Sequence, residues 1–190
     1  MTFTLLSASG FARRPWKNGL GETVTIASAA EGEGWQDALW SLSRTEIVND
    51  GPFSDFSGYA RWQVVIEGAG LVLETPAGEI DLRRPFEPVR YDGGLTIRAR
   101  LEAGPVGVVN LIARAAAFEA AMRVLAAGET VMLAPGTHIL FAPACDVGLA
   151  MEGARHFLAT GAAARLDLAV PSRLSCAASP LIVASIARRD

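Results

Sequence analysis

The stretch that decides the fold runs from Arg61 to Leu82 and reads RWQVVIEGAGLVLETPAGEIDL. It holds three short segments rich in strand-forming residues. Gly68-Ala69-Gly70 follows the first segment, and Pro76-Ala77-Gly78 follows the second. Short apolar segments joined by glycine and proline corners are typical of consecutive antiparallel strands. The stretch therefore predicts a β-meander with strands over Arg61–Glu67, Leu71–Thr75 and Glu79–Leu82.

The same pattern continues on both sides of the meander. We expect further strands over Thr2–Ser7, Thr23–Ala27, Ala38–Arg44, Leu95–Leu101 and Pro105–Ile112. Within Ala38–Arg44, apolar and polar residues alternate from Leu39 onward. Because successive strand residues point to opposite faces, Trp40 and Leu42 are predicted on one face, and Ser41 and Ser43 on the other.

The segment from Ala113 to Ala127 is ambiguous, because its alanines favour a helix locally while the residues beyond it favour strands. We interpret it as a short linker followed by a strand over about Ala120–Ala126. Short strands with glycine or proline between them then continue to Ala187. Many short strands at regular spacing indicate a sandwich or a barrel. The sequence thus predicts two closely packed all-β modules, residues 1–114 and residues 115–190.

Composition narrows the class of protein. The chain has 190 residues, of which 51% are hydrophobic, so it can bury a sizeable core. Its 17 basic and 20 acidic residues give a net charge of −3, which is not the basic footprint of a nucleic-acid-binding protein. No apolar run approaches the roughly 18 residues of a spanning helix, and no secretory signal is evident. We expect a cytoplasmic protein without membrane or nucleic-acid partners, with Cys145 and Cys176 reduced.

The sequence offers few groups for metal binding or nucleophilic catalysis. His138 and His156 are the two histidines, and they do not form an H-x-H pair. A metal site needs several His, Cys, Asp or Glu side chains that converge on one point. A G-x-S-x-G nucleophile elbow and a glycine-rich phosphate loop are also missing. We therefore expect no metal, no cofactor and no nucleophilic catalytic residue.

The first half does carry a concentration of polar and aromatic residues. Arg14–Thr23 reads RPWKNGLGET, a tight polar loop that leads into a strand. Arginine can grip a carboxylate through two hydrogen bonds, lysine adds a point charge, and aromatic walls exclude water. These residue types together predict a pocket for a small carboxylate, although surface ion pairs of Lys17 and Arg61 would also explain the two cations. The candidate ligand-binding residues are Trp16, Lys17, Asn18, Gly19, Thr23, Trp40, Ser41, Ser43, Phe53 and Arg61.

Several motifs resemble the HutD/Ves family of bacterial histidine-utilisation clusters and stress-induced loci. The most specific are Trp16–Thr23 (WKNGLGET) and Gly51–Gly58 (GPFSDFSG), joined by Trp40–Ser43, Arg61 and Glu67–Gly70. Pro85-Phe86, Asp92-Gly93 and Gly104–Leu111 fit the same pattern. The resemblance covers about residues 11–114 with specific motifs and the remainder loosely. This chain departs from the family pattern at Leu20. The family usually has three glycines after the asparagine, whereas Gly19, Leu20 and Gly21 follow Asn18 here.

The resemblance implies a cupin-like fold of the jelly-roll type, with two β-barrel modules in one chain and without the usual cupin metal ligands. It also implies a role in regulating histidine breakdown or a stress response, through a small carboxylate such as urocanate or formylglutamate. The module of residues 1–114 would carry the site, and the second module would support it or form a homodimer surface.

Two alternatives to a binding protein remain open from the residues. A cupin-type isomerase or hydrolase would need an acid or base in the pocket, for which Lys17, Glu22 and Asp92 are available. A protein-interaction module would instead use the apolar second half as its interface.

Overall fold

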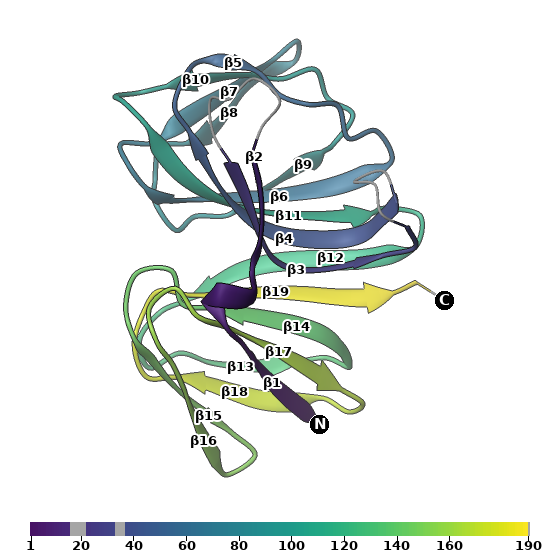
Figure 1. Ribbon diagram of the computed structural model, residues 1–190, viewed down its shortest axis with the longest axis vertical. Helices are drawn as coiled ribbons and strands as arrows, with labels where there is room; N and C mark the ends of the chain where they lie inside the picture. The colour runs from purple at the N-terminus through teal and green to yellow at the C-terminus, as the bar shows by residue number, and fades with distance from the viewer. Residues whose placement is uncertain (16–21, 33–36, 190) are drawn as a thin grey trace. The chain divides into compact units, whose positions relative to one another are not determined.

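A computed structural model describes residues 1–15, 22–32 and 37–189 of the chain. In these ranges the protein is built from β-strands, with one short 3-10 helix, η1 (Ala8–Gly10), and no α-helix. The chain divides into two compact units (Figure 1). The central unit is Ala12–Phe118, and the terminal unit joins Met1–Phe11 to the chain from Glu119 onward.

The central unit contains two antiparallel sheets. The six-stranded sheet has the order β2-β3-β4-β11-β6-β9, with β2 Ala12–Pro15, β3 Glu22–Ala30, β4 Ala38–Ile47, β11 Val106–Arg114, β6 Tyr59–Glu67 and β9 Val89–Asp92. The four-stranded sheet has the order β5-β10-β7-β8, with β5 Gly51–Pro52, β10 Arg98–Leu101, β7 Leu71–Thr75 and β8 Gly78–Leu82.

An apolar core joins the two sheets of the central unit. Ile47 and Val108 of the six-stranded sheet belong to the same buried cluster as Leu71 and Leu73 of the four-stranded sheet. The turn between β6 and β7 depends on Gly70, which has φ +95° and lies so close to Arg83 that an added Cβ would be 2.5 Å from its Cα. Glycine tolerates this conformation and this contact, whereas other residues do not.

The terminal unit also contains two antiparallel sheets. The five-stranded sheet has the order β1-β17-β14-β19-β12, with β1 Thr2–Leu6, β17 Ala163–Leu168, β14 Gly136–Phe141, β19 Leu181–Arg188 and β12 Phe118–Leu125. The four-stranded sheet has the order β13-β18-β15-β16, with β13 Thr130–Leu133, β18 Ser172–Cys176, β15 Val147–Met151 and β16 Ala154–Leu158. Leu140 and Leu166 of the first sheet share a buried cluster with Leu149 and Leu174 of the second.

The structure confirms the all-β class and most of the predicted strands. The ambiguous segment forms β12, a strand that starts at Phe118, because pairing with β19 outweighs the local helix preference of its alanines. None of the described sheets closes into a barrel, so each unit is an open sandwich of two sheets.

The division of the chain differs from the predicted boundary after residue 114 in two respects, because the boundary falls after Phe118 and the start of the chain belongs to the other unit. The first strand, β1, pairs with β17, from Thr2 opposite Asp167 to Leu6 opposite Ala163. Residues 1–11 therefore belong to the unit that the second half of the chain forms. None of the helices within the described ranges is long and apolar enough to cross a membrane.

Candidate functional site

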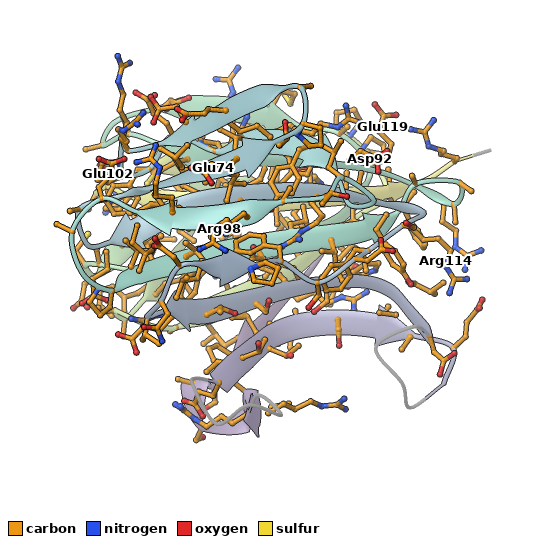
Figure 2. The ribbon with its side chains drawn as sticks, turned by 90° about the horizontal axis from the view of Figure 1, so that it is seen from above. Glu74, Asp92, Arg98, Glu102, Arg114 and Glu119 are labelled. Carbon is orange, nitrogen blue, oxygen red and sulfur yellow. The ribbon has the colours of Figure 1, made fainter. Side chains whose placement is uncertain are left out.

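The inner face of the six-stranded sheet changes from aliphatic to polar along its strands. On β11, Val106 and Val108 belong to the core between the two sheets. Alternate residues of a strand share a face, so Asn110 also points inward. On β6 the same step leads from Val65 to Gln63. The polar part of the sheet is at the C-terminal end of β11, near Asp92 and Arg114. Glu102 lies at the opposite side of the sheet (Figure 2).

Strand register aligns these polar residues into one row across the sheet. Ser43 of β4 and Gln63 of β6 lie directly opposite Asn110, one on each side. Thr25 of β3 lies opposite Ser43. Paired residues on neighbouring strands have Cβ atoms about 5 Å apart, so the four side chains form a continuous polar row.

Arg61 lies one step along β6 from the polar row, on the same face. It pairs with Ile112 of β11 and with Tyr91 of β9. Its side chain is 6% exposed. Its guanidinium carbon lies 4.8 Å from the ring centre of Phe56, 5.1 Å from that of Tyr91 and 5.2 Å from that of Phe53. The cation thus sits among three aromatic rings, at distances where each ring attracts it.

This buried cation has no counter-ion in the described part of the chain. Its Nε atom is enclosed and has no hydrogen-bond partner, and no carboxylate contributes to its pKa. Burial lowers the pKa of Arg61, with a small opposing effect from Tyr91. A guanidinium stays protonated in proteins, so the group remains a largely buried charge with aromatic contacts but no opposite charge beside it in the described residues.

A hydrogen-bonded loop holds two of the three rings in place. The backbone N–H of Phe53 donates to the carbonyl oxygen of Ile97 at 2.9 Å, and the N–H of Phe56 donates to that of Gly93 at 2.9 Å. Asp55 accepts two hydrogen bonds from Ser57, from its backbone N–H and its hydroxyl, both at 2.7 Å. These bonds lower the pKa of Asp55. The loop after β5 is therefore fixed by backbone contacts on both sides of the rings.

The third ring is held by a side-chain hydrogen bond. The Tyr91 hydroxyl donates to Oε1 of Gln63 at 2.8 Å, and both residues are buried. Burial raises the pKa of Tyr91 to about 12, against a weaker opposite effect of Arg61. Tyr91 is therefore a neutral hydrogen-bond donor at physiological pH.

Comparison with known proteins places the chain in a family. The HutD family matches residues 8–181. The chain belongs to the HutD family. It is 31% identical over 149 residues to a 21.2 kDa protein of the hutC 3′ region of Pseudomonas putida, a match that covers 78% of each chain.

Solved structures agree with this assignment and with the predicted cupin-like fold. A conserved protein of unknown function, PA5104 from Pseudomonas aeruginosa PAO1, superposes with a TM-score of 0.87 at 25% identity. HutD from Pseudomonas fluorescens SBW25 gives 0.84 at 27% identity, and both matches cover 100% of each chain. Protein YlbA from E. coli, at 10% identity and a TM-score of 0.67, shares the fold over 100% of this chain and 92% of its own.

The structure brings together four of the residues predicted for the site of this HutD-family chain. Ser41, Ser43 and Arg61 lie on the inner face of the six-stranded sheet, and Phe53 contacts Arg61. Thr23 lies on the same face but away from Arg61, because it pairs with Thr45, which lies opposite Val108 of the apolar core.

Other predicted residues are not part of this group. Trp40 is 4% exposed and lies on the face opposite to Ser41 and Ser43, as the alternation of β4 requires. Its aromatic character suggested a pocket wall, but its position in the strand excludes it. Trp16, Lys17, Asn18 and Gly19 lie outside the described residues.

Sequence reasoning missed four residues of the site: Phe56, Gln63, Tyr91 and Asn110. Asn110 was recognisable as the one polar residue of an otherwise apolar strand, and Gln63 as a polar residue beside Val64 and Val65. Phe56 lies within the GPFSDFSG motif. Tyr91 had no local signal, because its role depends on the pairing of β9 with β6.

Three of the groups considered for catalysis or metal binding, Glu22, Asp92 and His138, have structural partners here. Glu22 forms an ion pair with Arg13, and Asp92 accepts a hydrogen bond from the N–H of Gly94 at 2.8 Å. His138 lies 2.8 Å from the Ser185 hydroxyl through Nδ1 and 2.9 Å from the Ala134 carbonyl oxygen through Nε2. Among the residues that the structure describes, no three His, Cys, Asp or Glu side chains come together as a metal site.

Proposed function

We propose that this HutD-family protein binds a small carboxylate in its central unit without a metal, and that binding regulates histidine catabolism. The observation that carries the proposal is Arg61, a buried cation without a counter-ion in the described residues. The residues around it favour an organic anion over a surface ion pair.

The energetics of Arg61 support an anionic ligand. A buried charge is costly unless an opposite charge and hydrogen bonds compensate it. A carboxylate matches the guanidinium fork through two parallel hydrogen bonds, and it supplies the missing charge. The ligand would thus remove a cost that the unliganded protein carries.

The surroundings of Arg61 suit a small organic acid. The rings of Phe53, Phe56 and Tyr91 provide apolar walls around the cation. Apolar walls exclude water, and the attraction between the cation and an anion is stronger where water is excluded. Ser43 and Asn110, in the neighbouring polar row, supply further hydrogen-bonding groups for the remainder of the ligand.

The relatives support this choice of ligand class. One relative comes from the hutC 3′ region, and HutD from Pseudomonas fluorescens SBW25 was solved in a formate condition. Formate is the smallest carboxylate. Intermediates of histidine breakdown, urocanate and formylglutamate among them, are therefore the first ligands to test.

Thermal melting of the full chain with urocanate, formylglutamate, histidine and glutamate tests the proposal. A ligand at about a hundred times its Kd adds about 2.7 kcal/mol of apparent stability, which raises Tm by several degrees. Methyl urocanate, which lacks the carboxylate charge, should give no shift.

Two arginine variants complete this experiment. Arg61→Leu should abolish the shift and still fold, because leucine removes a buried charge without a counter-ion and keeps an apolar side chain among the rings. Arg44→Leu is the matched control, since Arg44 lies on β4 of the same sheet but is exposed and paired with Glu67 at 2.9 Å. A shift that survives in Arg61→Leu, or no shift with any carboxylate, would refute the proposal.

A further inference from the structure

The hydrogen bond between Tyr91 and Gln63 fixes the orientation of a carboxamide beside Arg61. Tyr91 lies opposite Arg61 in the pairing of β6 with β9, and its hydroxyl reaches along the sheet to Oε1 of Gln63 at 2.8 Å. Because Oε1 is the acceptor of this bond, the other end of the carboxamide is the Nε2 donor. Tyr91 thereby determines which end of Gln63 a ligand meets.

The Nε2 group of Gln63 is available to a ligand. It donates to no described residue. Unlike Arg61 Nε and Asn110 Oδ1, it is not fully enclosed by the protein. The small exposed part of Gln63, 1% of the residue, is therefore at Nε2. Nε2 has no hydrogen-bond partner among the described residues, so a ligand acceptor here would add a hydrogen bond and gain affinity.

The neighbouring groups have the same hydrogen-bonding character. Ser43 contributes a hydroxyl, which can donate, and Asn110 has its oxygen enclosed, so its accessible end is the amide nitrogen. Arg61 has donors alone. The inner face of this sheet end thus presents donors, and it is complementary to oxygen acceptors.

We infer that the ligand carries a second acceptor oxygen beside its carboxylate, and that Gln63, positioned by Tyr91, recognises it. The inference rests on the proposed function, in which Arg61 binds the carboxylate of the ligand. The Cα atoms of Arg61 and Gln63 are two residues apart on one strand, about 6.7 Å. The ligand class is therefore a short oxo-, amido- or dicarboxylic acid, in preference to an acid with an apolar chain.

Two probe acids of nearly equal shape test the inference by calorimetric titration of the full chain. 4-Oxopentanoate has a ketone oxygen where 4-methylpentanoate has a methyl group. The wild type should bind 4-oxopentanoate about five- to tenfold more tightly, which is the effect of one hydrogen bond. Equal affinities would overturn the inference and leave the proposed function intact. If neither probe binds at millimolar concentration, both the inference and the proposed function fail.

Variants separate positioning from structure. In Tyr91→Phe the ring remains over Arg61, so 4-methylpentanoate should bind as before, while the preference for 4-oxopentanoate falls below about twofold. Gln63→Leu should remove the preference for 4-oxopentanoate. This variant leaves the Tyr91 hydroxyl without its partner, so the double variant Gln63→Leu with Tyr91→Phe should give the same result without that unpaired hydroxyl. Tyr59→Phe is the matched control, because it removes another buried hydroxyl bond, from Tyr59 to the Ala38 carbonyl oxygen at 2.8 Å, and should keep the preference. A preference that persists in Tyr91→Phe would overturn the role of Tyr91.

Discussion

The backbone N–H of Phe56 donates to the carbonyl oxygen of Gly93, and this 2.9 Å bond joins the loop after β5 to the turn after β9. The N–H of Gly93 donates in turn to the carbonyl oxygen of Tyr59 at 2.8 Å. A Cβ at position 93 would collide with the carbonyl oxygens of Phe56 and Tyr59, and would lie 2.8 Å from that of Tyr59. The absence of a side chain at Gly93 therefore allows the Phe56 ring to reach Arg61.

Gly93→Ala tests this relationship. The methyl group should push the two segments apart, lower the free energy of unfolding by about 1–3 kcal/mol and weaken carboxylate binding. Urea unfolding and ligand titration measure the two effects. Gly51→Ala is the control, because a Cβ at position 51 would have no atom within 4 Å, and this substitution should cost less than about 0.5 kcal/mol. Equal effects of the two variants would contradict the role of Gly93.

Tyr91 should make stability depend on alkaline pH. Its pKa is about 12 in the folded protein and about 10 in the unfolded chain. The unfolded state therefore loses the proton first, and the stabilisation is complete below pH 10 and is lost as pH rises toward 12. Two pKa units correspond to about 2–3 kcal/mol. Urea unfolding at pH 9, 10 and 11 should show this decline, and Tyr91→Phe should remove it. If the free energy of unfolding of Tyr91→Phe declines by the same amount over this pH range, groups other than Tyr91 cause the decline.

His138 should make stability depend on mildly acidic pH. Burial lowers its pKa below the usual 6.5, against weaker effects of the Ala134 carbonyl and Asp167. The unfolded state binds the proton more readily, so stability is complete above pH 6.5 and falls as pH decreases through the folded pKa. Thermal melting between pH 7.5 and 5 should show a falling Tm, and His138→Gln should flatten the curve. An unchanged pH dependence in that variant would exclude His138.

The attachment of β1 to the terminal unit should depend on Phe3. Its ring stacks on His156 with centres 3.9 Å apart and an interplanar angle of 17°. Phe3→Ala should lower the free energy of unfolding by about 1–3 kcal/mol, because it removes this contact and part of the core. Leu5→Ala, on the same strand but 63% exposed, should cost less than about 0.5 kcal/mol. A loss in Phe3→Ala as small as that in Leu5→Ala would contradict the role of the Phe3 ring.

The fold was largely predictable because its signals are local. Glycine and proline corners marked the meander after Arg61, and the alternation in β4 separated Trp40 from Ser41. The partner of β1 was not predictable, since nothing near Thr2–Leu6 indicates β17. Pairing between segments so distant in sequence follows from the packing of the whole unit.

The site was predictable only in part, for the same reason. Residue types indicated Arg61, Ser43 and Phe53 as candidate binding groups. The rings around Arg61 come from a loop and from β9, so their convergence depends on loop closure and on register. Tyr91 could not be recognised before the pairing of β9 with β6 was known.

The pairing of β1 with β17 also affects the order in which the protein can fold during synthesis. All strands of the central unit are available once Phe118 has left the ribosome, so the unit that contains Arg61 can fold on the nascent chain. The terminal unit must wait for β17 and β19, and until then β1 has no partner strand. A chaperone or a ligand acting on the nascent chain would therefore encounter the folded central unit, with Arg61 among its three rings, before the protein is complete.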